Sequence, residues 1–317
     1  MKAPSQPASY VFGPVPSRRI GRSLGVDLVP FKTCTYDCIY CQLGSTTHQT
    51  LERKEWVPMD AVLEELQRKL DCRPDYITLS GSGEPTLHSR LGEIIRRIKA
   101  ISDVPVAVLT NGSLLWQQDV REEVALADLV LPSLDADNDY NFRFINRPHP
   151  DITFEQMVEG LIALRREFSG QYWLEVFLLG GYTAIEGNVK RLAALAKRIG
   201  PDRVQLNTVA RPPTEDFAMA VSPEALQKYA KFFDPPAEVI AERPSRLGHK
   251  SDKIQPAAVL EILRRRPCTV EHVAQGLGLN RLEAIKKIEA LMAKKQIETY
   301  RHEGEVFYRA RGHQEPS

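Results

Sequence analysis

The sequence lacks long apolar runs and a strong charge of either sign. No segment approaches the roughly 20 consecutive apolar residues that a membrane-spanning helix needs, and the start MKAPSQPASYVFGPVPSRR lacks the continuous apolar stretch of a secretory signal. The 42 lysines and arginines are balanced by 41 aspartates and glutamates, so the net charge is +1. No overall field draws the protein to nucleic acid or to a membrane, and any such partner needs a local patch. We expect a soluble protein of the cytoplasm.

Cysteine is scarce, with five residues in a chain of 317. Three of the five lie between Cys34 and Cys41, in the pattern C-x3-C-x2-C. This set is too small and too clustered for a disulfide framework, so it favours a shared metal over cross-links between distant elements. The same usage indicates a reducing compartment.

Short β-rich runs alternate with longer amphipathic segments over the first two thirds of the chain, as in βαβ units. Nearly continuous apolar strands separated by helices predict a parallel sheet covered by helices, and right-handed crossovers curl six such units into a partial barrel. The expected fold is therefore α/β, a partial (β/α)6 TIM-like barrel formed by residues 1–210. The predicted strands are 23–31, 75–80, 105–110, 128–135, 172–179 and 203–208, and the predicted helices are 59–72, 88–101, 115–126, 154–168 and 186–199.

The remainder of the chain has a different character. Residues 211–254 are rich in proline and predict a strap and linker with one helix, which is capped by Ser222 and has Pro223 in its first turn. Residues 255–313 follow the order of a small winged helix-turn-helix domain. Its predicted elements are helices at 257–266, 269–279 and 281–296, and a hairpin at 297–310 that turns at Glu303-Gly304.

This C-terminal module is locally basic. From Gln255 to His313 there are eleven lysines and arginines against seven aspartates and glutamates. Such a module can place a helix in a groove and neutralise phosphates, and peptide binding or a purely architectural role are the alternatives. The helix at 281–296 is expected to bury Leu282, Ile285, Ile288 and Met292 and to present Arg281, Lys286, Lys287, Lys294 and Lys295, with Arg301, His302 and Arg309 on the wing.

Cys34, Cys38 and Cys41 are expected in the loop after the first predicted strand, at the end of the barrel where such folds carry their chemistry. Thiolates are soft ligands that select zinc, copper(I) or iron–sulfur. A zinc site completed by His48 or His88 is one alternative, although structural zinc commonly takes two C-x2-C pairs and one is present here. The other is a [4Fe–4S] cluster, which is ordinarily held by four thiolates, so that three leave one iron open.

This motif, with Tyr40 before the third cysteine and after the first strand of a six-unit β/α chain, resembles the radical S-adenosylmethionine (SAM) superfamily over about residues 11–210. The resemblance implies that the three cysteines hold a [4Fe–4S] cluster whose open iron is chelated by SAM. It also implies an enzyme that takes an electron from a low-potential donor such as flavodoxin or ferredoxin. SAM is then cleaved to a 5′-deoxyadenosyl radical, which abstracts hydrogen from a second substrate.

Polar residues at the other strand ends are the candidates for holding SAM. The stretch LSGSGEPTLH resembles the family's Gly-Gly-Glu motif with Ser82 in place of one glycine, which implies that Glu84 holds the methionyl ammonium and that Gly83 lets the backbone come close. Glu175, in an otherwise apolar strand, indicates either an inward polar contact or a surface position facing a helix end. The remaining candidates are Tyr40 beside the adenine, Asn111, Ser133 in preference to Asp135 at the ribose hydroxyls, Asn207, and Arg211 facing a carboxylate or phosphate of SAM or of the second substrate.

Residues 13–34, together with LNTVARPP, resemble the branch that includes the tRNA wyosine synthetases. Those enzymes carry further cysteines upstream for a second cluster, and no cysteine precedes Cys34 here, so the resemblance stops short of wyosine synthesis itself. The second substrate is expected to be a macromolecule recruited by the winged helix, with RNA as the first class considered. A peptide or protein is the alternative substrate, and a non-catalytic iron–sulfur sensor that reads DNA is the alternative to an enzyme.

Overall fold

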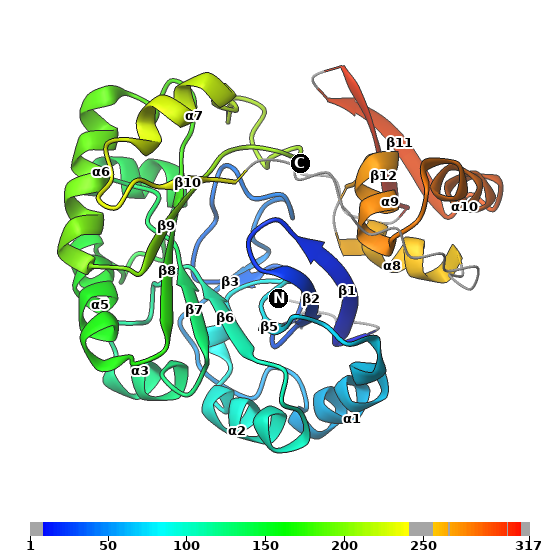
Figure 1. Ribbon diagram of the computed structural model, residues 1–317, viewed down its shortest axis with the longest axis horizontal. Helices are drawn as coiled ribbons and strands as arrows, with labels where there is room; N and C mark the ends of the chain where they lie inside the picture. Colours follow the sequence, from blue (N-terminus) through cyan, green and yellow to red (C-terminus); the bar gives the residue numbers. More distant parts are fainter. Residues whose placement is uncertain (1–8, 241–255, 266, 303, 312–317) are drawn as a thin grey trace.

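A computed structural model describes residues 9–240, 256–265, 267–302 and 304–311. Its centre is a curved, eight-stranded sheet with the strand order β1-β2-β5-β6-β7-β8-β9-β10 (Figure 1). All neighbours pair in parallel except β1, which is antiparallel to β2. The strands are β1 (Val11–Ser17), β2 (Gly21–Val26), β5 (Tyr76–Leu79), β6 (Val106–Thr110), β7 (Leu129–Pro132), β8 (Gln171–Phe177), β9 (Arg203–Asn207) and β10 (Glu238–Val239).

The predicted α/β fold with a mostly parallel sheet is confirmed. The six predicted strands correspond to β2 and β5 to β9, and they lie in the sheet in chain order. Helices join consecutive parallel strands and cover the outer face of the sheet, because each carries an apolar stripe (Figure 1). In the second of them the buried residues Leu91, Ile94, Ile95 and Ile98 follow the helical spacing. These helices are α1 (Met59–Lys69), α2 (Leu91–Ile101), α3 (Gln118–Val124), α5 (Phe154–Glu167) and α6 (Glu186–Ile199).

Short elements complete this part of the chain at the end of the sheet where the parallel strands finish. They are β3 (Thr33–Cys34), β4 (His48–Gln49), η2 (Pro85–Leu87), α4 (Asp139–Asn141) and the π-helical turn η3 (Phe142–Asn146). The short helix η1 (Leu70–Cys72) lies elsewhere and follows α1 directly. The pairing of β3 with β4 holds the start of the cysteine loop, because Thr33 faces His48 and Cys34 faces Gln49. No helix in the described ranges is long and apolar enough to cross a bilayer.

The predicted strap contains the helix expected from its sequence. Helix α7 (Pro223–Ala230) begins at Ser222, whose hydroxyl accepts a hydrogen bond from the Ala225 N–H. The strap also adds the short edge strand β10 to the sheet, beside β9, which the proline-rich composition did not indicate. Residues 241–254 of the predicted linker and residue 255 of the predicted C-terminal domain lie outside the described residues.

The C-terminal module has three helices and a hairpin in the predicted order: α8 (Pro256–Arg265), α9 (Val270–Leu277), α10 (Arg281–Ala293), β11 (Ile297–His302) and β12 (Glu305–Ala310). The predicted buried stripe of α10 is confirmed only in part, because Ile288 is buried as predicted and Leu282 and Met292 are exposed. Leu282 is 69% exposed and Met292 is 38% exposed, whereas Ala284, Ile288 and Leu291 are buried. The helix turns this second set inward because it packs on α8 and α9, and sequence spacing alone allowed either stripe.

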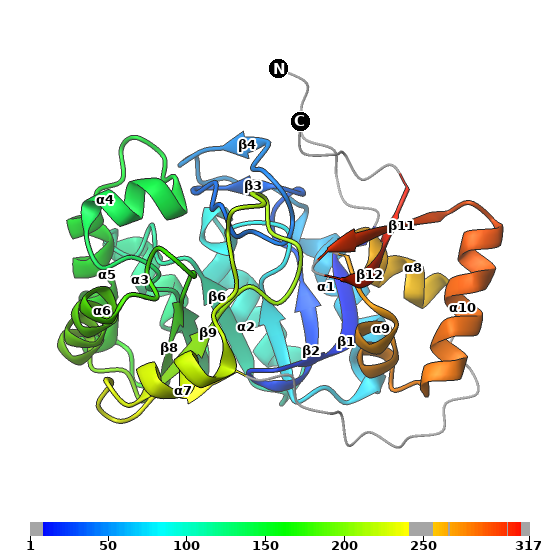
Figure 2. The ribbon, with the colours of Figure 1, turned by 90° about the horizontal axis from the view of Figure 1, so that it is seen from above.

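Strand β1 was not predicted, and it joins the two parts of the molecule. Its Val15 packs against the apolar core of the C-terminal module, and α9 lies beside β1 (Figure 2). The C-terminal module is therefore packed against the N-terminal edge of the sheet.

Candidate functional site

A cavity of about 390 Å³ opens at the carboxyl ends of the parallel strands. Such ends gather the functional side chains of β/α barrels, because the loops that follow the strands converge there. Every predicted site residue except Asp135 lines this cavity: Cys34, Tyr40, Cys38, Cys41, Gly83, Glu84, Asn111, Ser133, Asn207 and Arg211.

The three cysteine thiols of the loop each lie near a nitrogen donor. Lys32 Nζ is 3.3 Å from Cys41 Sγ, and the Asn111 side-chain amide is 3.6 Å from Cys34 Sγ. The Asn146 amide nitrogen is 3.5 Å from Cys38 Sγ. Donors of this kind stabilise the negative charge of a thiolate, and hydrogen bonds to sulfur tune iron–sulfur clusters.

Burial disfavours the ionised form of these thiols when no metal is bound. It raises the pKa of Cys34 to about 12, with the negative charge of Glu84 acting in the same direction. Burial likewise raises the pKa of Cys38 well above its usual value. Because a bound metal deprotonates a coordinating thiol outright, this donor set is suited to a cationic group that binds through sulfur.

The histidines proposed for the zinc alternative are engaged elsewhere. His88 is fully buried, its Nε2 lies 3.0 Å from the Val57 carbonyl oxygen, and its Nδ1 accepts from the Arg90 N–H. The His48 ring packs edge-on against Trp56. Within the described ranges, no three His, Cys, Asp or Glu side chains converge closely enough for a single metal ion. A [4Fe–4S] cluster takes one thiolate per iron, so its ligands need not meet at one point, and the three-thiol set fits it.

Glu84 is held firmly at the cavity wall. It is 1% exposed, and its Oε1 accepts from the Thr86 N–H and from the hydroxyls of Thr86 and Thr110. Its Oε2 accepts from the Asn111 N–H at 2.8 Å. Burial raises the pKa of Glu84 although these hydrogen bonds favour the carboxylate, so a cation in the cavity would stabilise its charge.

Gly83 has a reason within the fold for its missing side chain. A Cβ there would lie 1.8 Å from the Thr33 carbonyl oxygen, at the start of the cysteine loop. The Glu84 N–H donates to that same oxygen at 3.2 Å. Gly83 thus lets the cysteine loop and the Glu84 loop touch, which is a close approach of backbone to backbone.

Tyr40 forms an aromatic wall of the cavity. Its ring stacks on Phe177 with centroids 4.1 Å apart, and its hydroxyl donates to Asp135 Oδ2. Asp135 also accepts from the Asn146 amide at 3.0 Å and from the Phe177 N–H at 3.3 Å. Asp135 is not among the residues that line the cavity, and its carboxylate holds the Tyr40 ring in place by accepting from the hydroxyl; its role at a ribose stays a prediction. Burial raises the pKa of Asp135 to about 6.

Ser133 follows β7 and Asn207 ends β9, the strands on either side of β8, and both residues border the cavity. The inward polar contact predicted for Glu175 is confirmed, since Glu175 pairs with Arg19 and accepts from the Asn207 amide at 3.1 Å. Arg211 donates to the Gln42 side chain at 3.1 Å, next to the cysteine loop. The structure thus brings these strand-end residues to one cavity.

Three residues near the site were missed from the sequence. Lys32 lies two positions before Cys34, and this closeness in sequence could have indicated that it belongs to the site. Arg19 lies in the turn between β1 and β2. It was missed because strand β1 was not predicted, so the turn was not predicted either. Asn146 ends the π-helical turn η3, and no sequence pattern marks that turn as part of the site.

Comparisons with known proteins identify the family of this chain. The family model described as the radical SAM superfamily matches residues 28–193. A UPF0026 protein of Methanocaldococcus jannaschii is 31% identical over 95% of both chains. A GTPase Obg of Brachyspira hyodysenteriae is 42% identical over 83% of this chain, which spans 40% of that protein's length.

The solved structure of native anSMEcpe with bound AdoMet and Cp18Cys peptide has a similar fold. The TM-score is 0.51 at 15% identity, and the match covers 68% of this chain and 62% of that one. The chain belongs to the radical SAM superfamily, whose enzymes use a [4Fe–4S] cluster and S-adenosylmethionine, and within it to the UPF0026 proteins.

Proposed function

We propose that this protein is a radical SAM enzyme in which Cys34, Cys38 and Cys41 hold the cluster and the strand-end cavity holds SAM. The observation that carries the proposal is that the three thiols and the Glu84 carboxylate border one cavity. When bound, the reduced cluster supplies the electron that cleaves SAM to a 5′-deoxyadenosyl radical, and this radical abstracts hydrogen from a second substrate.

The chain's own residues prepare the cavity for this pair of cofactors. The nitrogen donors Lys32, Asn111 and Asn146 offset charge on the three thiolates. Glu84 would hold the methionyl ammonium through Oε2, because Oε1 already accepts hydrogen bonds from the two threonines.

The remaining wall residues recognise the nucleoside part and the carboxylate of SAM. Tyr40, fixed by Phe177 and Asp135, offers a flat face to the adenine. Ser133 and Asn207 supply polar groups for the ribose hydroxyls, and Arg211 suits a carboxylate. The reducing cytoplasm and a flavodoxin- or ferredoxin-type donor would keep the cluster active.

The C-terminal module is proposed to be a winged helix-turn-helix that recruits RNA. Two of its predicted basic contacts are internal, since Arg281 pairs with Glu271 and Arg309 pairs with Glu298. Lys286 on α10, together with Lys294 and Lys295 just after it, is exposed, and this favours phosphate contact. The resemblance to the wyosine synthetase branch supports RNA as the substrate class.

A peptide substrate is the second candidate, because α10 exposes apolar as well as basic side chains. Leu282 and Met292 stand outward on the same helix as the lysines. Peptide-binding helices use such apolar anchors.

Binding of bulk tRNA distinguishes the two candidates. For RNA, the variant Lys286→Glu/Lys294→Glu should bind several-fold more weakly, and the slope of log affinity against log salt should fall by about one per lysine lost. The control Lys231→Glu changes an exposed lysine beyond α7 and should leave binding unchanged. Salt-independent or absent tRNA binding would favour the peptide.

The cofactor assignment is tested on anaerobically reconstituted protein. We expect about four irons and four sulfides per chain, and an electron paramagnetic resonance signal of the reduced cluster that changes when SAM is added. Zinc in the cysteine loop, or a cluster signal that ignores SAM, would refute the assignment. A cluster that responds to SAM but does not cleave it would instead favour the sensor.

A further inference from the structure

We propose that Asp27 and Arg265 are positioning residues that couple the C-terminal module to the loop carrying Glu84, so that SAM affinity depends on how this module is docked. The inference rests on the proposed function, because it takes residues 80–84 as part of the SAM site. It assigns the module a second task besides recruitment of the other substrate.

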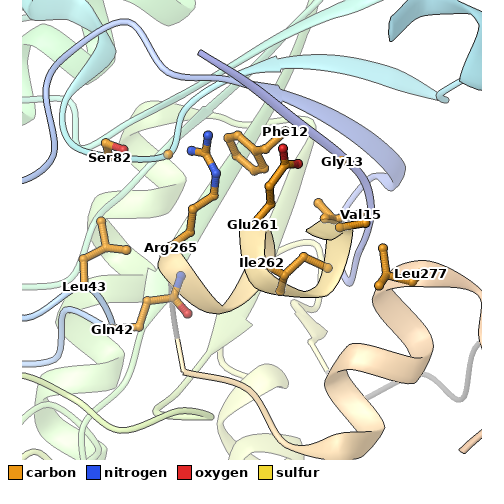
Figure 3. Close-up of a pocket in the computed structure, with 12 residues that line it drawn as sticks. Phe12, Gly13, Val15, Gln42, Leu43, Ser82, Glu261, Ile262, Arg265 and Leu277 are labelled. Atoms are coloured by element: carbon orange, nitrogen blue, oxygen red, sulfur yellow. The ribbon is translucent and has the colours of Figure 1, made fainter. Parts of the chain in front are cut away.

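Arg265, at the end of α8, connects the module to the barrel through three different contacts. It pairs with the Asp27 carboxylate through Nη1, and its Nη2 donates to the Ser9 carbonyl oxygen at 3.1 Å. Its guanidinium also lies over the Phe12 ring, 3.9 Å from the centroid. Figure 3 shows Arg265 extending from α8 toward Phe12. An arginine fork can make these contacts together, whereas a lysine cannot.

Asp27 faces the module with one oxygen and the SAM loop with the other. Its Oδ2 meets Arg265, and its Oδ1 accepts from the Ser82 N–H at 2.7 Å. The residue is 1% exposed. A Cβ on Gly81, whose φ is +125°, would lie 2.1 Å from Asp27 Oδ1, so the loop backbone rests directly on this carboxylate.

Ser82 links Asp27 to the cysteine loop and to the loop that carries Glu84. Its carbonyl oxygen accepts from the Lys32 N–H at 2.7 Å, and the Lys32 ammonium lies beside Cys41 Sγ. One residue further, Gly83 touches Thr33 and leads into Glu84. A shift of Asp27 would therefore change the positions of Glu84 and of the cysteine loop.

A second cavity under α8 adjoins the same loop. It lies between the module and the barrel, and its wall includes Glu261, Ile262 and Arg265 of α8 together with Gly81 and Ser82. Figure 3 shows the three α8 side chains and Ser82 around it. Residues of its wall, among them Gln42, Leu43 and Ser82, also line the large cavity. The end of α8 is thus part of the surroundings of the reaction cavity.

Loss of Arg265 would leave the Asp27 charge buried beside the loop without its cation, and a buried carboxylate in that state moves or takes up a proton. Either response alters the acceptor that holds the Ser82 N–H. A residue that merely fastened the module would lower stability without changing the affinity of folded protein for SAM.

The test is the SAM dissociation constant of reconstituted full-length protein, measured by isothermal titration calorimetry and normalised to bound iron. Arg265→Ala should bind SAM at least tenfold more weakly than the wild type with unchanged iron content. Arg264→Ala, which removes an exposed arginine from the same helix, should match the wild type. Should Arg265→Ala fail to fold, Arg265→Lys keeps the charge, loses the fork and should still bind severalfold more weakly.

Hydrogen–deuterium exchange supplies a readout that would not change if Arg265 only attached the C-terminal module to the barrel. Coupling is reciprocal, so SAM should slow amide exchange in α8 of the wild type. Affinity of the folded variants within twofold of the wild type, or exchange in α8 that ignores SAM, would overturn the inference. Failure of the wild type itself to bind SAM would instead refute the proposed function.

Discussion

The backbone N–H of Asn111 donates to Glu84 Oε2 at 2.8 Å, and the side-chain amide of the same residue lies 3.6 Å from Cys34 Sγ. Asn111 follows β6, Glu84 follows β5, and Cys34 stands at the start of the cysteine loop. One residue therefore fixes the distance between a proposed cluster ligand and the proposed ammonium acceptor.

Glu84→Gln should weaken SAM binding by about 10- to 100-fold while leaving iron content unchanged. Glutamine keeps an acceptor for the threonine hydroxyls but removes the charge opposite an ammonium, and such charge-assisted hydrogen bonds contribute about 1.5–3 kcal/mol. Calorimetric titration of reconstituted protein measures the change. Glu93→Gln, on the exposed arm of an ion pair with Arg90, serves as the control. Equal affinity of the Glu84 variant and the wild type would remove the role given to this carboxylate.

Asn146→Ala should lower the reduction potential of the cluster by about 40 mV, which corresponds to a hydrogen bond of about 1 kcal/mol in a one-electron couple. The reduced cluster carries more negative charge than the oxidised cluster. Removal of the amide beside Cys38 Sγ therefore destabilises the reduced form more than the oxidised form. A redox titration followed by electron paramagnetic resonance gives the value. Asn188→Ala removes an amide that donates to the Tyr182 carbonyl and should not shift the potential. A shift to higher potential would contradict the account.

The stability of the metal-free protein should depend on Asp135 between about pH 4 and pH 6. Burial raises the pKa of Asp135 in the folded chain from 3.8 to about 6, so the folded state binds more protons than the unfolded state in this window. The free energy of unfolding therefore falls as the pH rises, by about 3 kcal/mol at most from this group.

Urea unfolding of wild type and Asp135→Asn at pH 4 and pH 7 isolates this effect from the other titrating groups. Asparagine keeps an oxygen for the Tyr40 hydroxyl and carries no charge at either pH. The wild type should lose stability relative to the variant as the pH rises. A constant difference between the two proteins would show that Asp135 titrates as an ordinary carboxyl.

Much of the fold was predictable because its signals are local. Strand and helix periodicity located β2, β5 to β9 and the helices between them. The cysteine spacing and the strand-end residues placed most of the cavity wall, since parallel strands must finish at the same edge. The start of α7 was predictable from Ser222 because a capping residue lies directly before the helix that it caps.

What was missed depends on contacts distant in sequence. Arg265 and Asp27 are 238 positions apart, and nothing near either residue indicates the pair. The stripe of α10 was misplaced at Leu282 and Met292, because Leu282 and Ala284 fit alternative phases of one helix and packing on α8 and α9 decided between them. Asp135 was placed at the cavity because it ends a predicted strand, and the hydrogen bond from the Tyr40 hydroxyl to its carboxylate was not indicated by the sequence.

The central claim is tested most directly by the formation of 5′-deoxyadenosine from SAM when reconstituted protein is reduced with dithionite under anaerobic conditions. The wild type and the control Cys72→Ala, which alters a cysteine outside the loop, should form the product. The variant Cys34→Ala/Cys38→Ala/Cys41→Ala should form none. Equal product from the triple variant and the wild type, or no product from a wild type with a full cluster and bound SAM, would contradict the account.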